Sequence, residues 1–234
     1  MMNTHQQILN KMKFIEFNEQ IDLKSNLIIG VDEVGAGEYF GPLIGAAVLI
    51  PIENKQKLIN LGIKDSKALS DKKIIELAPK IQMLCEYGVY TLTPKGYNNL
   101  IDSYNANELK CLSHLKSIEK INSRADYIFI DQYSTLRSIE KYFERLLNVE
   151  FFALKSVSTD VILATKGEQK CLEVACASIL ARARLLQYQQ QMSMDYGITF
   201  EKGSSNKTKE FAQWLWKNRP DINPYLVCKK NFKM

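Results

Sequence analysis

The sequence predicts an α/β fold in which a mixed sheet of five strands is flanked by helices. Two apolar segments near the amino terminus, 27–31 and 43–50, have the length of buried strands, and the glycine-rich stretch 35–41 joins them as a turn. Farther along the chain, short apolar segments alternate with longer ones in which apolar residues recur at helical spacing. This order is typical of a sheet with helices on its faces.

The other elements follow from the same patterns. A third strand is predicted at 87–92, a fourth in the compact apolar segment 127–130, and a last short strand at 150–154. Helices are predicted at 71–84, within 96–122, at 138–147, from just after Gly167 to Met192, and at 211–216. Small residues at 175–178 are expected to let the longest helix approach the sheet closely.

The composition predicts one main domain. The chain has 234 residues, of which 46% are hydrophobic and 24% charged, which is ordinary for a soluble globular protein. We expect residues 27–234 to form this domain, including a helical tail at the carboxyl end. Residues 1–26 are polar, and we expect them to form a short helix or a loose arm before the domain.

Membrane and secretory classes are disfavoured. No apolar run reaches the roughly 18 residues that a membrane span needs, and residues 1–14 lack the apolar core of a signal peptide. Five scattered cysteines without a CxxC pair suggest neither a zinc site nor a disulfide framework. We therefore expect a cytoplasmic protein with no membrane partner. The net charge of +5 favours a polyanionic partner, although a solvated basic surface would give the same value.

Acidic residues stand at the ends of the predicted elements. Asp32 and Glu33 follow directly on the strand 27–31, and Asp131 follows the strand 127–130. If these two strands are parallel neighbours, their carboxylates converge. Each acid also has a structural alternative, because Asp commonly caps a turn or helix, and the helix dipole alone favours Glu168 at a helix start.

Convergence of these four carboxylates would require a cation, since buried carboxylates are costly without one. Oxygen ligands in a chain with only two histidines favour Mg²⁺ or Mn²⁺ over zinc. Two such ions about 4 Å apart can activate a water on one side of a phosphodiester and stabilise the departing 3′ oxygen on the other.

Four segments, in the same order along the chain, resemble the signature of the type 2 ribonucleases H. They are Gly30-Val31-Asp32-Glu33-Val34-Gly35-Ala36-Gly37-Glu38-Tyr39-Phe40-Gly41-Pro42, Asp65-Ser66-Lys67-Ala68-Leu69-Ser70, Ile130-Asp131-Gln132-Tyr133, and Ala175-Cys176-Ala177-Ser178-Ile179-Leu180-Ala181-Arg182. The resemblance implies an RNase H-like fold and cleavage of the RNA strand of RNA/DNA hybrids with Mg²⁺ or Mn²⁺. It also implies that the metal-binding and catalytic acids are Asp32, Glu33, Asp131 and Glu168.

Within this family the chain resembles ribonuclease HIII. Ribonuclease HII usually has Gly-Arg-Gly after the acidic pair and an Asp as fourth acid, whereas this chain has Ala36 and Glu168. Ribonuclease HIII usually also carries an amino-terminal substrate-binding domain resembling the TATA-binding protein, which 26 residues are too few to form. We therefore expect hybrid affinity to be weaker or to rest on the tail, at Lys229, Lys230 and Lys233.

Several further residues are candidates for binding the hybrid duplex. The amides of Gly35, Ala36 and Gly37 can approach the RNA sugar edge and test for the 2′-OH, although a tight turn with positive φ would explain both glycines as well. Ser66 and Lys67 lie in a matching segment and are expected to contact substrate. Lys166 and Arg182 are weaker phosphate candidates, and His114 is expected to be a surface or packing residue.

Three alternatives stay open. The first is ribonuclease HII-like activity, which includes cutting at a single ribonucleotide embedded in DNA. The second is a hybrid-binding module without catalysis, and the third is an enzyme acting on a small phosphorylated substrate, for which no P-loop or Rossmann glycine pattern is present. A monomer is the expected state. Cleavage at a single embedded ribonucleotide discriminates the first alternative, and the most informative experiment is cleavage of labelled hybrids in Mg²⁺ and Mn²⁺.

Overall fold

The structure, a computed structural model, describes residues 12–63 and 69–232. In this part of the chain a six-stranded mixed sheet has the order β1-β6-β5-β2-β3-β4. Its strands are β1 Phe14–Glu16, β2 Ile28–Val34, β3 Leu43–Leu49, β4 Glu86–Leu92, β5 Tyr127–Asp131 and β6 Asp160–Ala164. β2, β3 and β4 pair antiparallel, and β2, β5, β6 and β1 pair parallel. The α/β class is confirmed, with one strand more than predicted.

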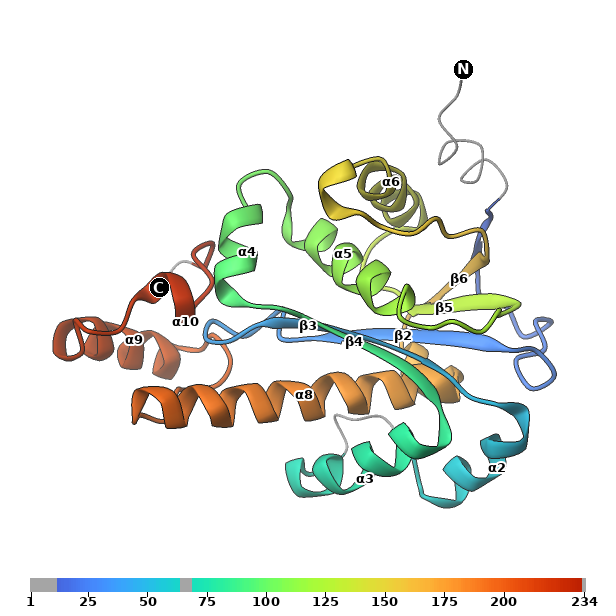
Figure 1. The fold of residues 1–234 in the computed structure, drawn as a ribbon, viewed down its shortest axis with the longest axis horizontal. Coiled ribbons are helices and arrows are strands. Elements are labelled where there is room, and N and C mark those ends of the chain that lie inside the picture. Colours follow the sequence, from blue (N-terminus) through green and yellow to red (C-terminus); the bar gives the residue numbers. More distant parts are fainter. Residues whose placement is uncertain (1–11, 64–68, 233–234) are drawn as a thin grey trace.

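Helices cover both faces of the sheet (Figure 1). On one face lie α4 Pro94–Leu100, α5 Ala106–Ile118 and α6 Leu136–Leu147, and on the other lie α2 Ile52–Asn60, α3 Asp71–Leu84 and α8 Leu172–Tyr196. A four-residue helix, α7 Gly167–Lys170, precedes α8, and α9 Asn206–Asn218 and α10 Pro224–Val227 follow it. None of the described helices is both long and apolar enough to cross a membrane.

Three predicted elements differ from the structure. The segment predicted as a strand at 150–154 contains the 3-10 helix η2 Glu150–Phe152, which ends at Ala153 with a left-handed backbone, φ +46°. The strand β6 lies later instead, at Asp160–Ala164, and was not predicted. Residues 14–16, within the expected arm, form the edge strand β1 parallel to β6. The segment predicted as one long helix is divided at Cys171, so Glu168 belongs to α7 and not to α8.

The longest helix touches the central strand with backbone against backbone. A Cβ added at Gly30 of β2 would lie 2.2 Å from the carbonyl carbon of Glu173 and the amide nitrogen of Val174 in α8. Buried small residues on the same helix, Ala175, Cys176 and Ala177, fill the space that remains. The expected close approach is therefore present, and it fixes α8 beside the acids of β2.

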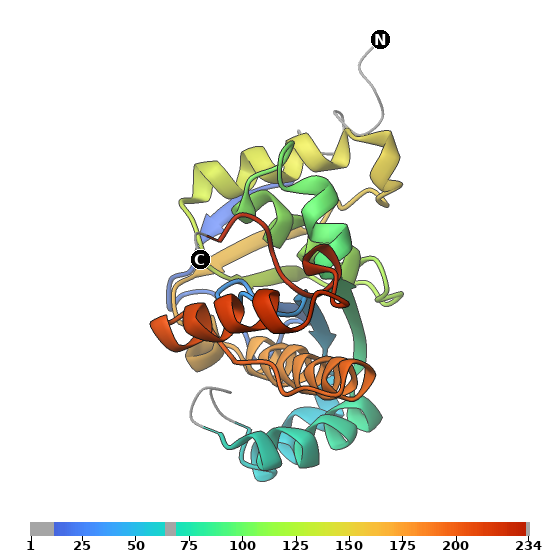
Figure 2. The same cartoon turned by 90° about the vertical axis from the view of Figure 1, so that its left-hand side faces the viewer.

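The carboxyl-terminal tail packs at one end of the molecule, next to α4 and the last turns of α8 (Figures 1 and 2). Lys229, expected to contact substrate, is fully buried there. Its Nζ donates to the carbonyl oxygens of Glu38, at 2.7 Å, and Gly41, at 2.8 Å. Lys230 pairs with Asp102, and Lys233 lies outside the described residues. The tail therefore braces the turn between β2 and β3, and Lys229 is not a surface cation.

We predict that Lys229→Met lowers the free energy of unfolding by about 1–3 kcal/mol, because two buried carbonyl oxygens lose their donor. Burial lowers the pKa of Lys229 from 10.5 to about 7. Between these values the unfolded chain binds more protons than the native one, so this group's contribution to stability rises with pH. The difference between wild type and Lys229→Met should thus widen from pH 7 to pH 9 in urea unfolding.

Lys230→Met is the matched control, because Lys230 is exposed and its ion pair with Asp102 lies on the surface. It should leave stability nearly unchanged at every pH. A difference between wild type and Lys229→Met that stays constant with pH would contradict the role given to burial.

Candidate active site

Asp32 and Glu33 lie inside β2, which continues to Val34, and not after a strand ending at Val31. The strand is longer than predicted because residues 32–34 pair with 44–46 of β3. Successive side chains of a strand point to opposite faces of the sheet. Asp32 accordingly faces α8, where it contacts Ser178, and Glu33 faces α5, where it contacts His114.

Asp32 is a buried carboxylate among other carboxylates. Only 9% of the residue is exposed, and its Oδ1 accepts a hydrogen bond from the amide of Glu33 at 2.8 Å. Burial raises the pKa of Asp32 well above its usual range, and the charges of Glu33 and Asp131 raise it further. Ser178 donates a hydrogen bond that offsets part of this effect. A cation at this position would favour the ionised form.

Asp131 ends β5, the parallel neighbour of β2. The two strands pair up to Val31 and Ile130, so Asp32 and Asp131 are the next residues along each. Neighbouring strands lie about 4.8 Å apart, which brings the two acids side by side. The sequence predicted that these acids converge if the two strands are parallel neighbours, and the strands are parallel neighbours.

The turn before α8 brings Glu168 toward Asp131. The amide of Gly167 donates to Oδ1 of Asp131 at 2.7 Å, and a Cβ at Gly167 would lie 3.2 Å from the Asp131 Cα. Glu168 follows directly and is 9% exposed. Its Oε2 is buried and has no hydrogen-bond partner within the described residues. An unpaired buried carboxylate oxygen is costly unless a cation or water binds it.

Two side chains of α5 contact Glu33, on the face of the sheet opposite to α8. Its Oε2 lies 2.8 Å from Nε2 of His114, and its Oε1 lies 3.1 Å from Nζ of Lys110. Burial alone would raise the pKa of Glu33, but the hydrogen bond to His114 and the charges of His114 and Lys110 outweigh it, so the pKa is lowered. His114 is fully buried and packs against Tyr133, so of its two expected positions, surface or packing, the structure has the second. Sequence reasoning missed both partners, whose only local signal is their i,i+4 spacing.

A cavity of about 380 Å³ opens beside these acids. Asp32, Glu33 and Asp131 line it together with Arg182 and Lys202. The two basic side chains both contact Asp71, at 2.7 and 3.0 Å. The cavity thus combines a carboxylate wall with basic groups that can meet phosphate oxygens. Asp71 and Lys202 were not predicted as site residues.

The donor set fits a hard divalent ion. Asp32, Asp131 and Glu168 offer carboxylate oxygens, one of them buried and unpartnered, and such ions prefer oxygen ligands. Within the described residues no three Asp, Glu, His or Cys side chains lie close enough together, as placed, to hold a metal ion. Within the described residues the Glu33 carboxylate contacts two side chains of α5, and the Asp131 carboxylate accepts a hydrogen bond from the Gly167 amide.

The remaining candidates lie around the β2–β3 turn or outside the described residues. Gly35 has φ +90° and a buried position, so the turn requires glycine there. Gly37 has no positive φ and is exposed, so turn geometry does not explain it. Ala36 is half-buried between them. Ser66 and Lys67 lie outside the described residues.

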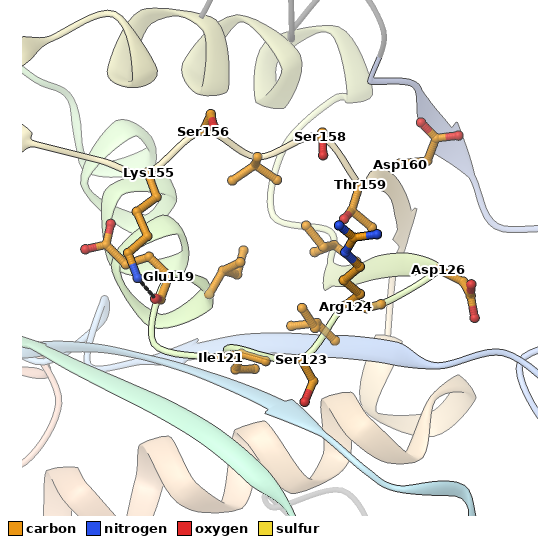
Figure 3. A pocket seen from close by; sticks show the side chains of 15 residues that line it. Glu119, Ile121, Ser123, Arg124, Asp126, Lys155, Ser156, Ser158, Thr159 and Asp160 are labelled. Carbon is orange, nitrogen blue, oxygen red and sulfur yellow. Dashed lines mark hydrogen bonds between the residues drawn. The ribbon is translucent and has the colours of Figure 1, made fainter.

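A larger cavity, of about 770 Å³, lies at the other end of β5 and β6, where these strands begin. Its lining includes Asp126, just before β5, and Asp160, the first residue of β6 (Figure 3). Lys155 points into it and donates to the carbonyl oxygen of Glu119 at 3.1 Å. None of the four candidate acids lines this cavity. The smaller cavity is therefore the candidate active site.

Comparisons with known proteins show which family the chain is similar to. Residues 29–233 match the family model described as Ribonuclease HII. A ribonuclease HIII of Limosilactobacillus fermentum is 35% identical over 202 residues, covering 85% of this chain and 65% of that protein. One of Protochlamydia amoebophila is 35% identical over 231 residues, covering 97% and 72%.

Among solved structures, Bst-RNase HIII in complex with Mn²⁺ is similar, with a TM-score of 0.82 and 30% identity. The likeness covers 90% of this chain and 68% of that one. The chain thus spans about two thirds of the length of several proteins that it matches.

Proposed function

Because the chain belongs to the type 2 ribonuclease H family, we propose that it is a metal-dependent endoribonuclease that cuts the RNA strand of RNA/DNA hybrids, as a ribonuclease HIII does. The observation that carries the proposal is the pair of acids Asp32, which is buried, and Asp131, which is half-buried, side by side on neighbouring parallel strands in one cavity. Each carboxylate disfavours ionisation of the other, and a bound cation would favour the ionised form of both.

Asp32, Glu33, Asp131 and Glu168 would hold the metal, and Mg²⁺ or Mn²⁺ would be the ion. The similar Bst-RNase HIII was solved with Mn²⁺. When bound, divalent ions in such a site activate the attacking water and neutralise charge on the departing oxygen. The chain itself positions the carboxylates, through the Gly167 amide at Asp131 and the Ser178 hydroxyl at Asp32.

The hybrid would bind across the same cavity. Arg182 and Lys202 stand on its wall and would meet phosphates, exchanging their contacts with Asp71. The exposed amide of Gly37, in the turn next to Glu33, would approach the RNA sugar and test for the 2′-OH. Gly35, Ala36, Ser66 and Lys67 remain part of the proposed substrate-binding set.

We also propose that the protein acts in the cytoplasm as a monomer, with residues 27–234 as the catalytic domain. The five cysteines are all free, as expected in a reducing compartment. In this division, residues 1–26 are an arm whose strand β1 completes the sheet edge.

The test is cleavage of an end-labelled RNA/DNA hybrid by the purified chain in Mg²⁺, in Mn²⁺ and in chelator. We expect internal cuts in the RNA strand with either metal and none in chelator. The DNA strand and duplex DNA should stay intact. Binding of the hybrid without cleavage under any metal condition would instead support a non-catalytic binding module.

We predict that continuous RNA tracts are cut far more efficiently than a single ribonucleotide embedded in DNA. Ala36 lacks the guanidinium that ribonuclease HII usually places in this turn, so fewer contacts hold a lone ribonucleotide. Initial rates on two labelled duplexes of equal length, one with a continuous RNA strand and one with a single ribonucleotide, measure the ratio. Equal rates would place the activity with ribonuclease HII.

A further inference from the structure

Each carboxylate oxygen of Glu33 has a side-chain partner from α5. Lys110 lies 3.1 Å from Oε1 and His114 lies 2.8 Å from Oε2. Only 10% of the Glu33 side chain is exposed, so both contacts are shielded from solvent. A metal that binds Glu33 therefore competes with groups of this chain.

The two partners come from one face of α5, which is seated directly on the sheet. Lys110 and His114 are four residues apart and so share a helix face. A Cβ at Gly45 of β3 would lie 2.5 Å from the carbonyl oxygen of Ser113, so α5 meets the strand with its backbone. Asn105 and Glu108 form a capping box that fixes the start of this helix.

The partners differ in their freedom to move. The His114 side chain is fully buried and packs edge-on against Tyr133, so it cannot withdraw from Glu33 without repacking. The Lys110 side chain is 19% exposed, and its Nζ lies 5.1 Å from the centre of the Tyr133 ring. At this same position the ammonium group also contacts an aromatic face, and that contact does not depend on the carboxylate.

We propose that the Lys110 ammonium group pairs with Glu33 in the metal-free protein, where it takes the place of the metal ion. Lys110 must release Oε1 of Glu33 when the metal binds. His114 keeps Oε2 and orients the carboxylate in both states. This inference rests on the proposed function, because it takes Glu33 as a metal-binding acid. Lys110 and His114 are thus positioning residues: the first opposes metal binding and the second supports it.

The proposal predicts opposite effects of the two residues on metal affinity. Lys110→Met keeps most of the side-chain volume and removes the competing charge, so Mn²⁺ affinity should rise by at least about fivefold. His114→Ala should weaken affinity by about 10- to 100-fold, and His114→Gln, which keeps a donor, should recover part of it. Free Mn²⁺ is measured by its electron paramagnetic resonance signal, without hybrid.

Lys116→Met is the matched control on the same helix, because Lys116 pairs with Glu119 and not with a candidate metal ligand. Its affinity should equal that of wild type. Without metal, Lys110→Met should melt at a lower temperature than wild type, since Glu33 then lacks the lysine charge. Added Mn²⁺ should raise the melting temperature of Lys110→Met more than that of wild type. This thermal readout also shows that each variant is folded.

Unchanged or weaker Mn²⁺ binding by Lys110→Met would overturn the inference, even if the wild-type protein cuts hybrids. Tighter binding by Lys110→Met in a protein that does not cut hybrids would overturn the proposed function and leave the inference standing. If His114→Ala does not fold, the comparison of Lys110→Met with Lys116→Met decides the matter.

Discussion

Replacing Asp32 by Asn is expected to reduce metal-dependent hybrid cleavage by at least about a thousandfold while leaving the protein folded. Asp32 is buried beside Asp131, where a carboxylate contributes a charge that the neutral amide of Asn cannot supply. The same loss is expected for Asp131→Asn. Turnover of a labelled hybrid at saturating Mn²⁺, followed by initial rate, measures the effect.

Melting temperature shows whether the loss of cleavage in Asp32→Asn comes from unfolding. Burial, together with the charges of Glu33 and Asp131, raises the pKa of Asp32, so the native state binds more protons than the unfolded one as pH rises through the usual Asp range. The ionised group therefore costs stability at neutral pH in the metal-free protein. Asp32→Asn should melt at the same or a higher temperature without metal and should lose the stabilisation by Mn²⁺.

Asp102→Asn is the control, because Asp102 is an exposed acid that pairs with Lys230 on the surface. It should leave both turnover and the response to Mn²⁺ unchanged. Near-wild-type turnover of both Asp32→Asn and Asp131→Asn would exclude these acids as metal-binding groups for the proposed reaction.

The acids could be located from sequence because each stands at a change of local pattern. An apolar run ends at Val31 and another at Ile130, and acids follow both. The helix α3 was predicted with its bounds, since Ser70 caps it and apolar residues recur along one face. Local patterns were sufficient wherever an element is defined by its own residues.

Elements and contacts defined by distant partners could not be predicted. Residues 150–154 are as apolar and aromatic as a strand, yet the chain turns there at Ala153, and β6 begins six residues after Leu154. The contacts of Lys110 and His114 with Glu33 join α5 to β2 and depend on the space left by Gly45. The spacing of residues within α5 does not predict which strand this helix packs against.

The tail shows the same limit for charge. Three lysines in the last six residues suggested a basic surface, but Lys229 turns inward and donates to the carbonyl oxygens of Glu38 and Gly41. A lysine count gives net charge, whereas its effect on binding depends on which side chains reach solvent.

The largest loss of stability is expected from a substitution at the close contact between β2 and α8. Gly30→Ala would place a Cβ 2.2 Å from the α8 backbone at Glu173 and Val174, where no side chain can rotate away. The helix would have to move from the sheet, which should cost about 3 kcal/mol or more. Because Asp32 lies two residues along the same strand and Ser178 lies on the same helix, hybrid cleavage should fall as well.

Gly37→Ala tests the opposite case within the same segment. A Cβ there would meet no atom within 4 Å, and Gly37 does not have a positive φ, so stability should change by no more than about 0.5 kcal/mol. Urea unfolding of both variants gives the comparison. A methyl group at Gly37 would instead crowd the proposed approach of the RNA sugar, raising KM for the hybrid with little change in melting temperature. Equal stability of Gly30→Ala and Gly37→Ala would show that α8 can shift freely, and the position of Asp32 would then not depend on that contact.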